Sequence, residues 1–256
     1  MDFQIKEQYF LVGGAGSGFG RAIAAALAAE DAQVLAVSRT EEKLIELQKS
    51  FPKQIKYIAG DITTAEVHEM IMKQLVGKKL SGVLVNAGGP PTGQFEEISM
   101  EQWEQGWNTV VKWKIQLIKL LLPHFIDNKY GRIVFIESVS VKQPVANLIL
   151  SNSLRPAIVG FAKTLAQEVA GNGITLNVLA PGYHSTAAME RLFKKKSELE
   201  NISIDEAKHA FEKEIIVGEM GTPEEMAVLA LWLLSPLSRF VTGQTFSHDG
   251  GIVKGI

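Results

Sequence analysis

The stretch from Tyr9 to Ile23 constrains the fold more than any other part of the chain. A short apolar run breaks into glycines and then into an alanine-rich pattern with helical spacing, which predicts a strand, a tight turn and a helix over about 18–29. The glycines have the spacing Gly14-x-x-x-Gly18-x-Gly20. Because glycine permits positive φ and the first amides of a helix attract negative charge, the turn is expected to bind an anion. The alternative is a glycine-rich turn with only a packing role.

The rest of the chain alternates between short apolar runs and longer helical patterns. Continuous apolar runs are typical of parallel sheets covered by helices on both faces. A charged segment, 184–216, interrupts the alternation just after a strand, where a doubly wound sheet binds its ligand, so a lid is expected there. Strands are expected at 9–12, 33–38, 55–59, 80–85, 132–136, 174–180 and 241–247, and further helices at about 41–50, 65–77, 100–128, 153–170 and 223–234.

Composition restricts the classes of protein and partner. The chain has 256 residues, of which 46% are hydrophobic, so one α/β domain with a large core is expected. A formal charge of −2 without a basic tract argues against nucleic acid or an anionic membrane as the main partner. The chain has no cysteine, which excludes disulfides and thiolate metal sites and fits a cytoplasmic protein. We see no signal-peptide pattern, and the apolar stretches are too short for a membrane span.

Several landmarks follow one another in a characteristic order. They are the glycine turn, Gly60-Asp61, Asn86-Ala87-Gly88, a strand ending at Ser138, Pro181-Gly182 with Thr186, and a final Asp249-Gly250-Gly251. Over essentially its whole length the chain resembles the short-chain dehydrogenase/reductase superfamily. The resemblance implies a Rossmann-type, doubly wound sheet of seven parallel strands in a single domain, 1–256, with a lid insertion at about 184–216. It also implies a homotetramer or homodimer that acts on a small-molecule substrate.

The end of the second strand predicts the cofactor. In dinucleotide-binding folds, an acidic side chain at this position binds the adenosine ribose and would repel a 2′-phosphate. Here the position holds Ser38, and Arg39 follows. A small hydroxyl beside a guanidinium suits a phosphate, so NADP(H) is predicted rather than NAD(H). The alternative is that Arg39 is a solvated surface residue.

The resemblance implies further cofactor contacts by matching position. Asp61 is expected near the adenine, although it can equally cap a helix, and Pro181-Gly182 can be a plain turn. The remaining expected contacts are Gly14, Ser17, Gly18, Phe19, Gly20, Ile62, Asn86, Ala87, Gly88, Pro181, Gly182 and Thr186.

The expected catalytic residues depart from the family pattern. In the superfamily, a serine, a tyrosine, a lysine and an asparagine of the preceding helix assist hydride transfer. Here the serine is present as Ser138. Ser151 stands where the family has the tyrosine, Arg155 where it has the lysine and Val110 where it has the asparagine. A serine hydroxyl is far less acidic than a phenol and its side chain is too short to replace it. Arginine can hold the cofactor ribose but cannot shuttle a proton. Pro156, directly after Arg155, is expected to start or bend the helix near Leu154.

Three functions remain open. In the first, favoured here, the protein is an NADP(H)-dependent reductase of a carbonyl or conjugated small molecule, in which Ser138 orients the carbonyl and Arg155 holds the cofactor. The proton then comes from water, from Tyr183 or from His184, and Lys142 is a lower-ranked candidate donor. An enone, a quinone or a 2-oxo acid derivative would need little acid assistance.

In the second function the protein binds NADP(H) without turnover, as a sensor or oligomeric partner. The third is a metal-assisted or hydrolytic enzyme. The chain's 5 histidines lack ligand spacing, so no metal site is predicted.

Overall fold

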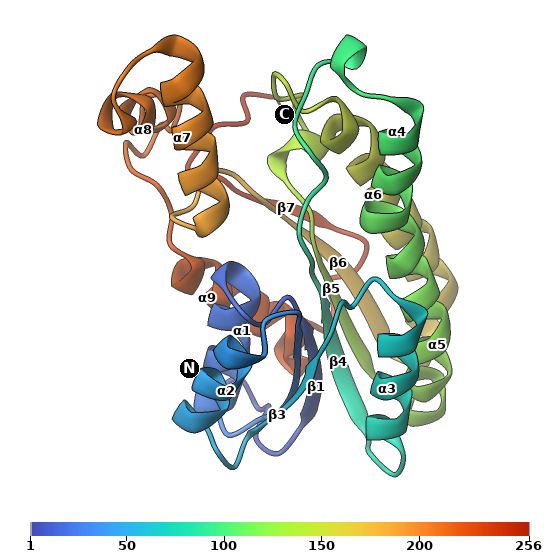
Figure 1. Ribbon diagram of the computed structural model, residues 1–256. Coiled ribbons are helices and arrows are strands. Elements are labelled where there is room, and N and C mark those ends of the chain that lie inside the picture. The colour runs from blue at the N-terminus through green and yellow to red at the C-terminus, as the bar shows by residue number, and fades with distance from the viewer. Residues whose placement is uncertain (1, 256) are drawn as a thin grey trace.

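The central element is a seven-stranded parallel sheet (Figure 1). The computed structural model describes residues 2–255, apart from the side chains of residues 188 and 199. The strand order β3-β2-β1-β4-β5-β6-β7 reverses direction between β1 and β4, which confirms the predicted doubly wound sheet. The strands are β1 (Tyr9–Gly13), β2 (Gln33–Ser38), β3 (Ile55–Ala59), β4 (Leu80–Val85), β5 (Gly131–Ile136), β6 (Ile174–Pro181) and β7 (Thr245–His248).

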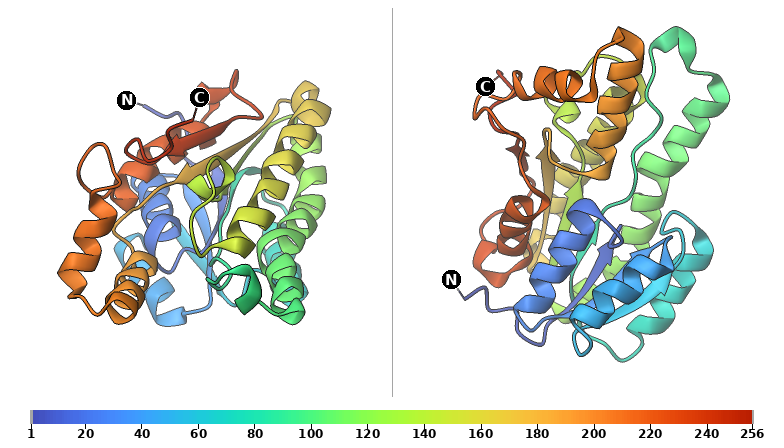
Figure 2. Two further views of the ribbon diagram at one scale, coloured as in Figure 1. Left: turned by 90° about the horizontal axis from the view of Figure 1, so that it is seen from above. Right: turned by 60° about the vertical axis from the view of Figure 1, so that its left-hand side comes forward.

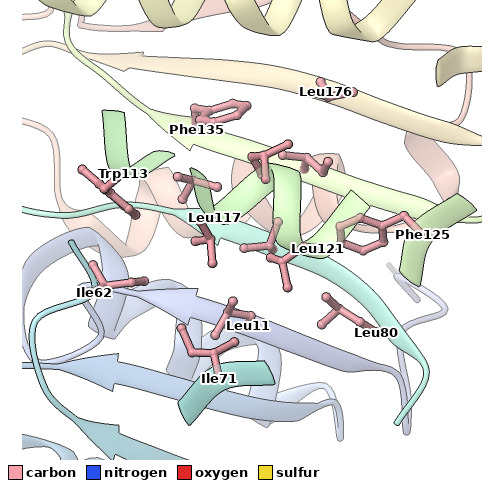
Figure 3. Packing of buried hydrophobic residues seen from close by; sticks show 14 of the residues in the cluster. Leu11, Ile62, Ile71, Leu80, Trp113, Leu117, Leu121, Phe125, Phe135 and Leu176 are labelled. Carbon is pink, nitrogen blue, oxygen red and sulfur yellow. The ribbon is translucent and has the colours of Figure 1, made fainter. Parts of the chain in front are cut away.

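Helices cover both faces of the sheet, and each face buries its own hydrophobic cluster. One layer contains α1 (Gly18–Ala29), α2 (Glu41–Ser50) and α9 (Pro223–Leu234). The other contains α3 (Ala65–Leu75), α5 (Trp113–Asn128) and α6 (Ile149–Val169), with α4 (Met100–Trp107) at its upper end in Figure 1. Figure 3 shows α5 packing on the sheet through Trp113, Leu117, Leu121 and Phe125. This fixes α5 rigidly beside β4 and β5.

The helix predicted over 100–128 is interrupted. A π-helical turn, Asn108–Lys112, separates α4 from α5. A π turn holds about one residue more than an α turn, so it rotates the side chains beyond it by roughly 100°. Val110 and Val111 are both buried in this turn, and Lys114, two residues past it, is also buried. The periodicity of the sequence does not reveal this change.

Helix α6 also differs from the prediction, because it begins at Ile149 and contains Pro156 in its interior. The prediction of a start near Leu154 is wrong. The reason is tertiary: Asn152 Nδ2 donates to Val145 O (2.8 Å), and Val145 N donates to Asn152 Oδ1 (3.1 Å). These two bonds anchor the first helical turn to the preceding loop, upstream of the proline.

The segment predicted as a lid forms two helices, α7 (Ala187–Glu200) and α8 (Ile204–Glu212). They lie beyond the carboxyl ends of the strands, away from the two helix layers (Figure 2). Lys195 Nζ of α7 donates to Thr92 Oγ1 (3.1 Å). This hydrogen bond links the α7–α8 segment to the loop that follows β4. Across residues 2–255, no helix has the length and apolar character needed to cross a bilayer.

Candidate cofactor and active site

The glycine turn between β1 and α1 has the geometry of an open anion cradle. Gly14 and Gly18 have φ of +67° and +52°. A Cβ on Gly20 would lie 2.3 Å from the Gly14 carbonyl oxygen, so only glycine permits this close passage of strand and helix. Ser17 is the N-cap residue of α1, but within the described residues its side chain caps no amide. The first amides of α1 and the Ser17 hydroxyl can therefore face a ligand.

The end of β2 lies against this turn. A Cβ on Gly16 would lie 2.3 Å from Ser38 Oγ, which places the half-buried serine beside the cradle. Arg39 follows and is exposed, and it joins none of the ion pairs found among residues 2–255. The Ser38 hydroxyl thus stands next to the anion cradle, and the exposed Arg39 is the next residue along the chain.

The loop after β4 lies against the glycine turn. Asn86 Nδ2 donates to Gly13 O (3.3 Å), and a Cβ on Gly14 would lie 2.5 Å from the same nitrogen. Asp61 Oδ1 accepts the backbone N–H of Thr63 (3.0 Å) in the turn before α3, whose N-cap is Thr64, so Asp61 is not the helix cap. Ile62 is buried beside the turn, where its Cδ1 would lie 2.9 Å from a Cβ on Gly13.

The end of β6 completes this group. Gly182 N donates to His248 O (3.0 Å), and a Cβ on Gly18 would lie 3.6 Å from the Thr186 methyl group. The structure therefore gathers the predicted cofactor residues of the turn, β2, β4 and β6 at one edge of the sheet.

Ser138 lies directly after β5 and is half-buried. Its Oγ accepts the backbone N–H of Ser140 (3.1 Å), which leaves its hydroxyl proton free to donate. Ser151, which the sequence predicts at the family's tyrosine position, is buried: its Oγ accepts a hydrogen bond from Arg155 Nε (3.0 Å) and shares another with Ser140 Oγ (3.0 Å). Ser151 is thus held inside a buried polar network, while Ser138 presents the accessible hydroxyl.

A buried ion cluster adjoins these serines. The Glu137 side chain is fully buried; its Oε1 accepts Lys114 Nζ (2.5 Å) and its Oε2 accepts Arg155 Nη1 (3.0 Å). Arg155 Nη1 also donates to the Glu137 backbone oxygen (3.0 Å). Burial lowers the pKa of Lys114, and the Glu137 carboxylate opposes that shift. We call Lys114, Glu137 and Arg155 the ion triad.

Sequence reasoning missed two members of the ion triad, Lys114 and Glu137. The available signals were a lysine within the apolar pattern of α5 and an acidic residue at the buried end of β5. Val110, which the sequence predicts at the family's asparagine position, is buried and supplies no polar group.

Tyr183, one of the alternative proton donors, is engaged elsewhere. Its hydroxyl donates to Glu214 Oε2 (2.9 Å), and its ring packs edge-on against Phe211 of α8. Burial and the Glu214 carboxylate raise the pKa of Tyr183 well above its ordinary value. These contacts make Tyr183 an anchor of the α7–α8 segment and a weak acid.

His184, the other alternative donor, is almost completely buried. Its Nδ1 lies 3.1 Å from Gly182 O, and its Nε2 lies 2.8 Å from His248 Nδ1. A carbonyl only accepts, so His184 carries its proton on Nδ1 and its Nε2 accepts from His248. Burial lowers the pKa of His184, and its ring packs edge-on against Phe19 of the glycine turn. Both ring nitrogens are thus committed to protein partners.

Comparisons with known proteins agree with the fold. Residues 14–253 match the family model adh_short_C2, described as enoyl-(acyl carrier protein) reductase. The chain belongs to the short-chain dehydrogenase/reductase superfamily. Among its superfamily relatives, 3-oxoacyl-(acyl carrier protein) reductase FabG of Thermotoga maritima is 28% identical, over 98% of this chain and 99% of that protein.

Solved structures of superfamily members give the same result. L-sorbose reductase from Gluconobacter frateurii, complexed with NADPH and L-sorbose, superposes with a TM-score of 0.93 at 25% identity and 100% coverage of both chains. The NADPH-dependent reductase YwfH, involved in bacilysin biosynthesis, gives 0.91 at 25% identity, over 98% of this chain and 100% of that one. The predicted superfamily and fold are confirmed.

Proposed function

We propose that the protein is an NADP(H)-dependent reductase of a small carbonyl or conjugated substrate. The observation that supports this most directly is the open anion cradle at the start of α1 with Ser38 and exposed Arg39 beside it. The cradle suits a diphosphate, and Arg39 suits a 2′-phosphate. Superfamily members with NADPH bound share the fold. When bound, NADPH supplies a hydride to the substrate.

Ser138 is the proposed ligand of the substrate oxygen. Its hydroxyl proton is free because its Oγ accepts the Ser140 amide, so it can donate to a carbonyl oxygen. Arg155 is the proposed positive group that holds the cofactor ribose and stabilises charge at the oxygen. Its guanidinium keeps its protons, so the final proton comes from water.

The proposed substrate class follows because, in this mechanism, no side chain described at the site transfers a proton to the substrate oxygen. An oxygen that gains negative charge without immediate protonation is best tolerated when the charge is delocalised, as in the enolate from a conjugated carbonyl. We therefore propose that enones and quinones react faster than simple ketones, and that 2-oxo acid derivatives do so too because the adjacent electron-withdrawing carbonyl group activates their keto group.

The test is NADPH oxidation with a panel of enones, quinones, diketones, 2-oxo acids and simple ketones. Oxidation by the conjugated members is expected, and Ser138→Ala should lower kcat about a hundredfold or more. Ser153→Ala, on the exposed side of α6, is the matched control and should leave kcat unchanged. Equal activity of Ser138→Ala and wild type would contradict the role given to Ser138.

A second function is favoured by the serine network. Ser151 is buried among protein donors, and the phenol of the family is missing, as expected of a protein that binds NADP(H) as a sensor or oligomeric partner. NADPH binding without oxidation by any panel member would establish this alternative.

The segment 184–216 is proposed as the lid of the site, because it lies beyond the strand ends and Lys195 links it to Thr92. A homodimer or homotetramer is also proposed. Its support is the exposed apolar side chains of Trp107, Leu120 and Ile126 on α4 and α5. Size-exclusion chromatography with light scattering tests the oligomer.

A further inference from the structure

The ion triad contains more positive than negative charge. Lys114 and Arg155 each carry one formal positive charge, and Glu137 carries one negative charge. Arg155 already satisfies one carboxylate oxygen and the Glu137 backbone oxygen. An Arg155–Glu137 pair alone would be neutral, so Lys114 brings the triad to a net charge of +1.

Burial of the Lys114 ammonium group costs free energy, and the fold imposes this burial. The Lys114 side chain is 4% exposed, and it lies on α5 in register with the buried face that contains Leu117 and Leu121. Burying an ammonium group is expensive unless it is paired, and here one carboxylate serves two cations. A leucine or methionine at this position would avoid the cost, so the extra charge calls for a functional explanation.

Arg155 is the member of the ion triad that lies nearest to the proposed cofactor site. Nη1 and Nε of this residue are bound to Glu137 and Ser151. Nη2 points to the loop after β4, where a Cβ on Gly89 would lie 2.9 Å from it. This loop contains Asn86, which lines the glycine turn. The charge of the triad is therefore presented between the loop and Ser138.

We propose that Lys114 is a positioning residue that offsets the Glu137 carboxylate, so that Arg155 presents a net positive charge to the nicotinamide end of the cofactor. The inference rests on the proposed NADP(H) site. An oxidised nicotinamide ring is cationic and a reduced ring is uncharged, so a positive triad disfavours NADP⁺ and retains NADPH. The protein thereby selects the form of the cofactor that can donate hydride.

The test measures the dissociation constants of NADPH and NADP⁺ by titration calorimetry without substrate. Lys114→Met keeps an unbranched side chain that is one atom shorter and makes the triad neutral, so the ratio Kd(NADP⁺)/Kd(NADPH) should fall about five- to tenfold. Lys114→Met/Glu137→Gln returns the net charge to +1 and should restore the ratio to within about twofold of wild type. An unchanged ratio in Lys114→Met overturns the proposal.

The double variant separates charge from packing. If Lys114 only filled space, removing Glu137 as well would add a second defect, and the ratio would not recover. Lys112→Met, an exposed change in the adjoining π turn, is the control and should leave the ratio unchanged. If Lys114→Met does not fold, Glu137→Gln alone raises the net charge to +2 and should raise the ratio. A fall in that variant also overturns the proposal.

The result can be told apart from failure of the proposed enzyme activity. The affinity ratio needs no substrate, so it can behave as expected even when no panel compound is reduced. Conversely, NADPH oxidation with an unaltered ratio in Lys114→Met would refute only the role of Lys114. Absence of binding for both cofactor forms would refute both proposals.

Discussion

Replacing Gly20 with alanine is expected to destabilise the protein and weaken NADPH binding together. The new Cβ would lie 2.3 Å from Gly14 O and 2.8 Å from Gly13 O, both backbone atoms at the end of a buried strand. Helix α1 must therefore move away from β1 by about 1 Å to restore van der Waals contact. Overpacking of this kind costs about 1–3 kcal/mol, which corresponds to a fall in Tm of roughly 3–10 °C in a chain of this size.

The matched control is Gly160→Ala on the exposed face of α6. Nothing lies within 4 Å of a Cβ at Gly160, so alanine there should stabilise the helix by about 0.5–1 kcal/mol. Differential scanning fluorimetry gives both Tm values, and tryptophan quenching or calorimetry gives the NADPH affinity. The displaced α1 amides should weaken NADPH binding in Gly20→Ala by about tenfold or more. Wild-type Tm and NADPH affinity in Gly20→Ala would refute the assignment of the turn as the cofactor cradle.

Three further predictions concern other contacts. Arg39→Asp should shift preference from NADPH toward NADH by about ten- to a hundredfold, measured as the ratio of their affinities; an unchanged ratio would remove Arg39 from the 2′-phosphate site. Since the folded-state pKa of His184 lies below its ordinary value of 6.5, its contribution to stability is present above pH 6.5 and is lost as the pH falls below it. The melting temperature should therefore fall less between pH 7 and pH 5 in His184→Asn than in wild type, and equal slopes would contradict this assignment. Tyr183→Phe loses the 2.9 Å bond to Glu214, so the free energy of unfolding should fall by about 0.5–1.5 kcal/mol while kcat stays unchanged; a large loss of kcat would make Tyr183 a proton donor after all.

The sequence predicted the elements whose signal is local. Continuous apolar runs marked the parallel strands, and glycine spacing marked the turn between β1 and α1, because both depend on neighbouring residues. Together with the family resemblance, spacing within one helix also predicted Ser151 and Arg155 at the positions where the family has tyrosine and lysine. The boundaries failed where tertiary contacts took over, as at the start of α6, which Asn152 anchors upstream of Pro156.

By itself, then, the sequence determined the sheet, and it predicted the cradle and a site without the family's phenol. Only the tertiary structure decided what surrounds the cradle. Glu137 lies 23 residues from Lys114 and 18 from Arg155, so only the tertiary fold brings these three side chains together. His184 and its partner His248 are 64 residues apart. Such contacts form where the carboxyl ends of several parallel strands lie side by side. The spacing of residues within one strand or helix does not predict which residues of other elements will lie next to them.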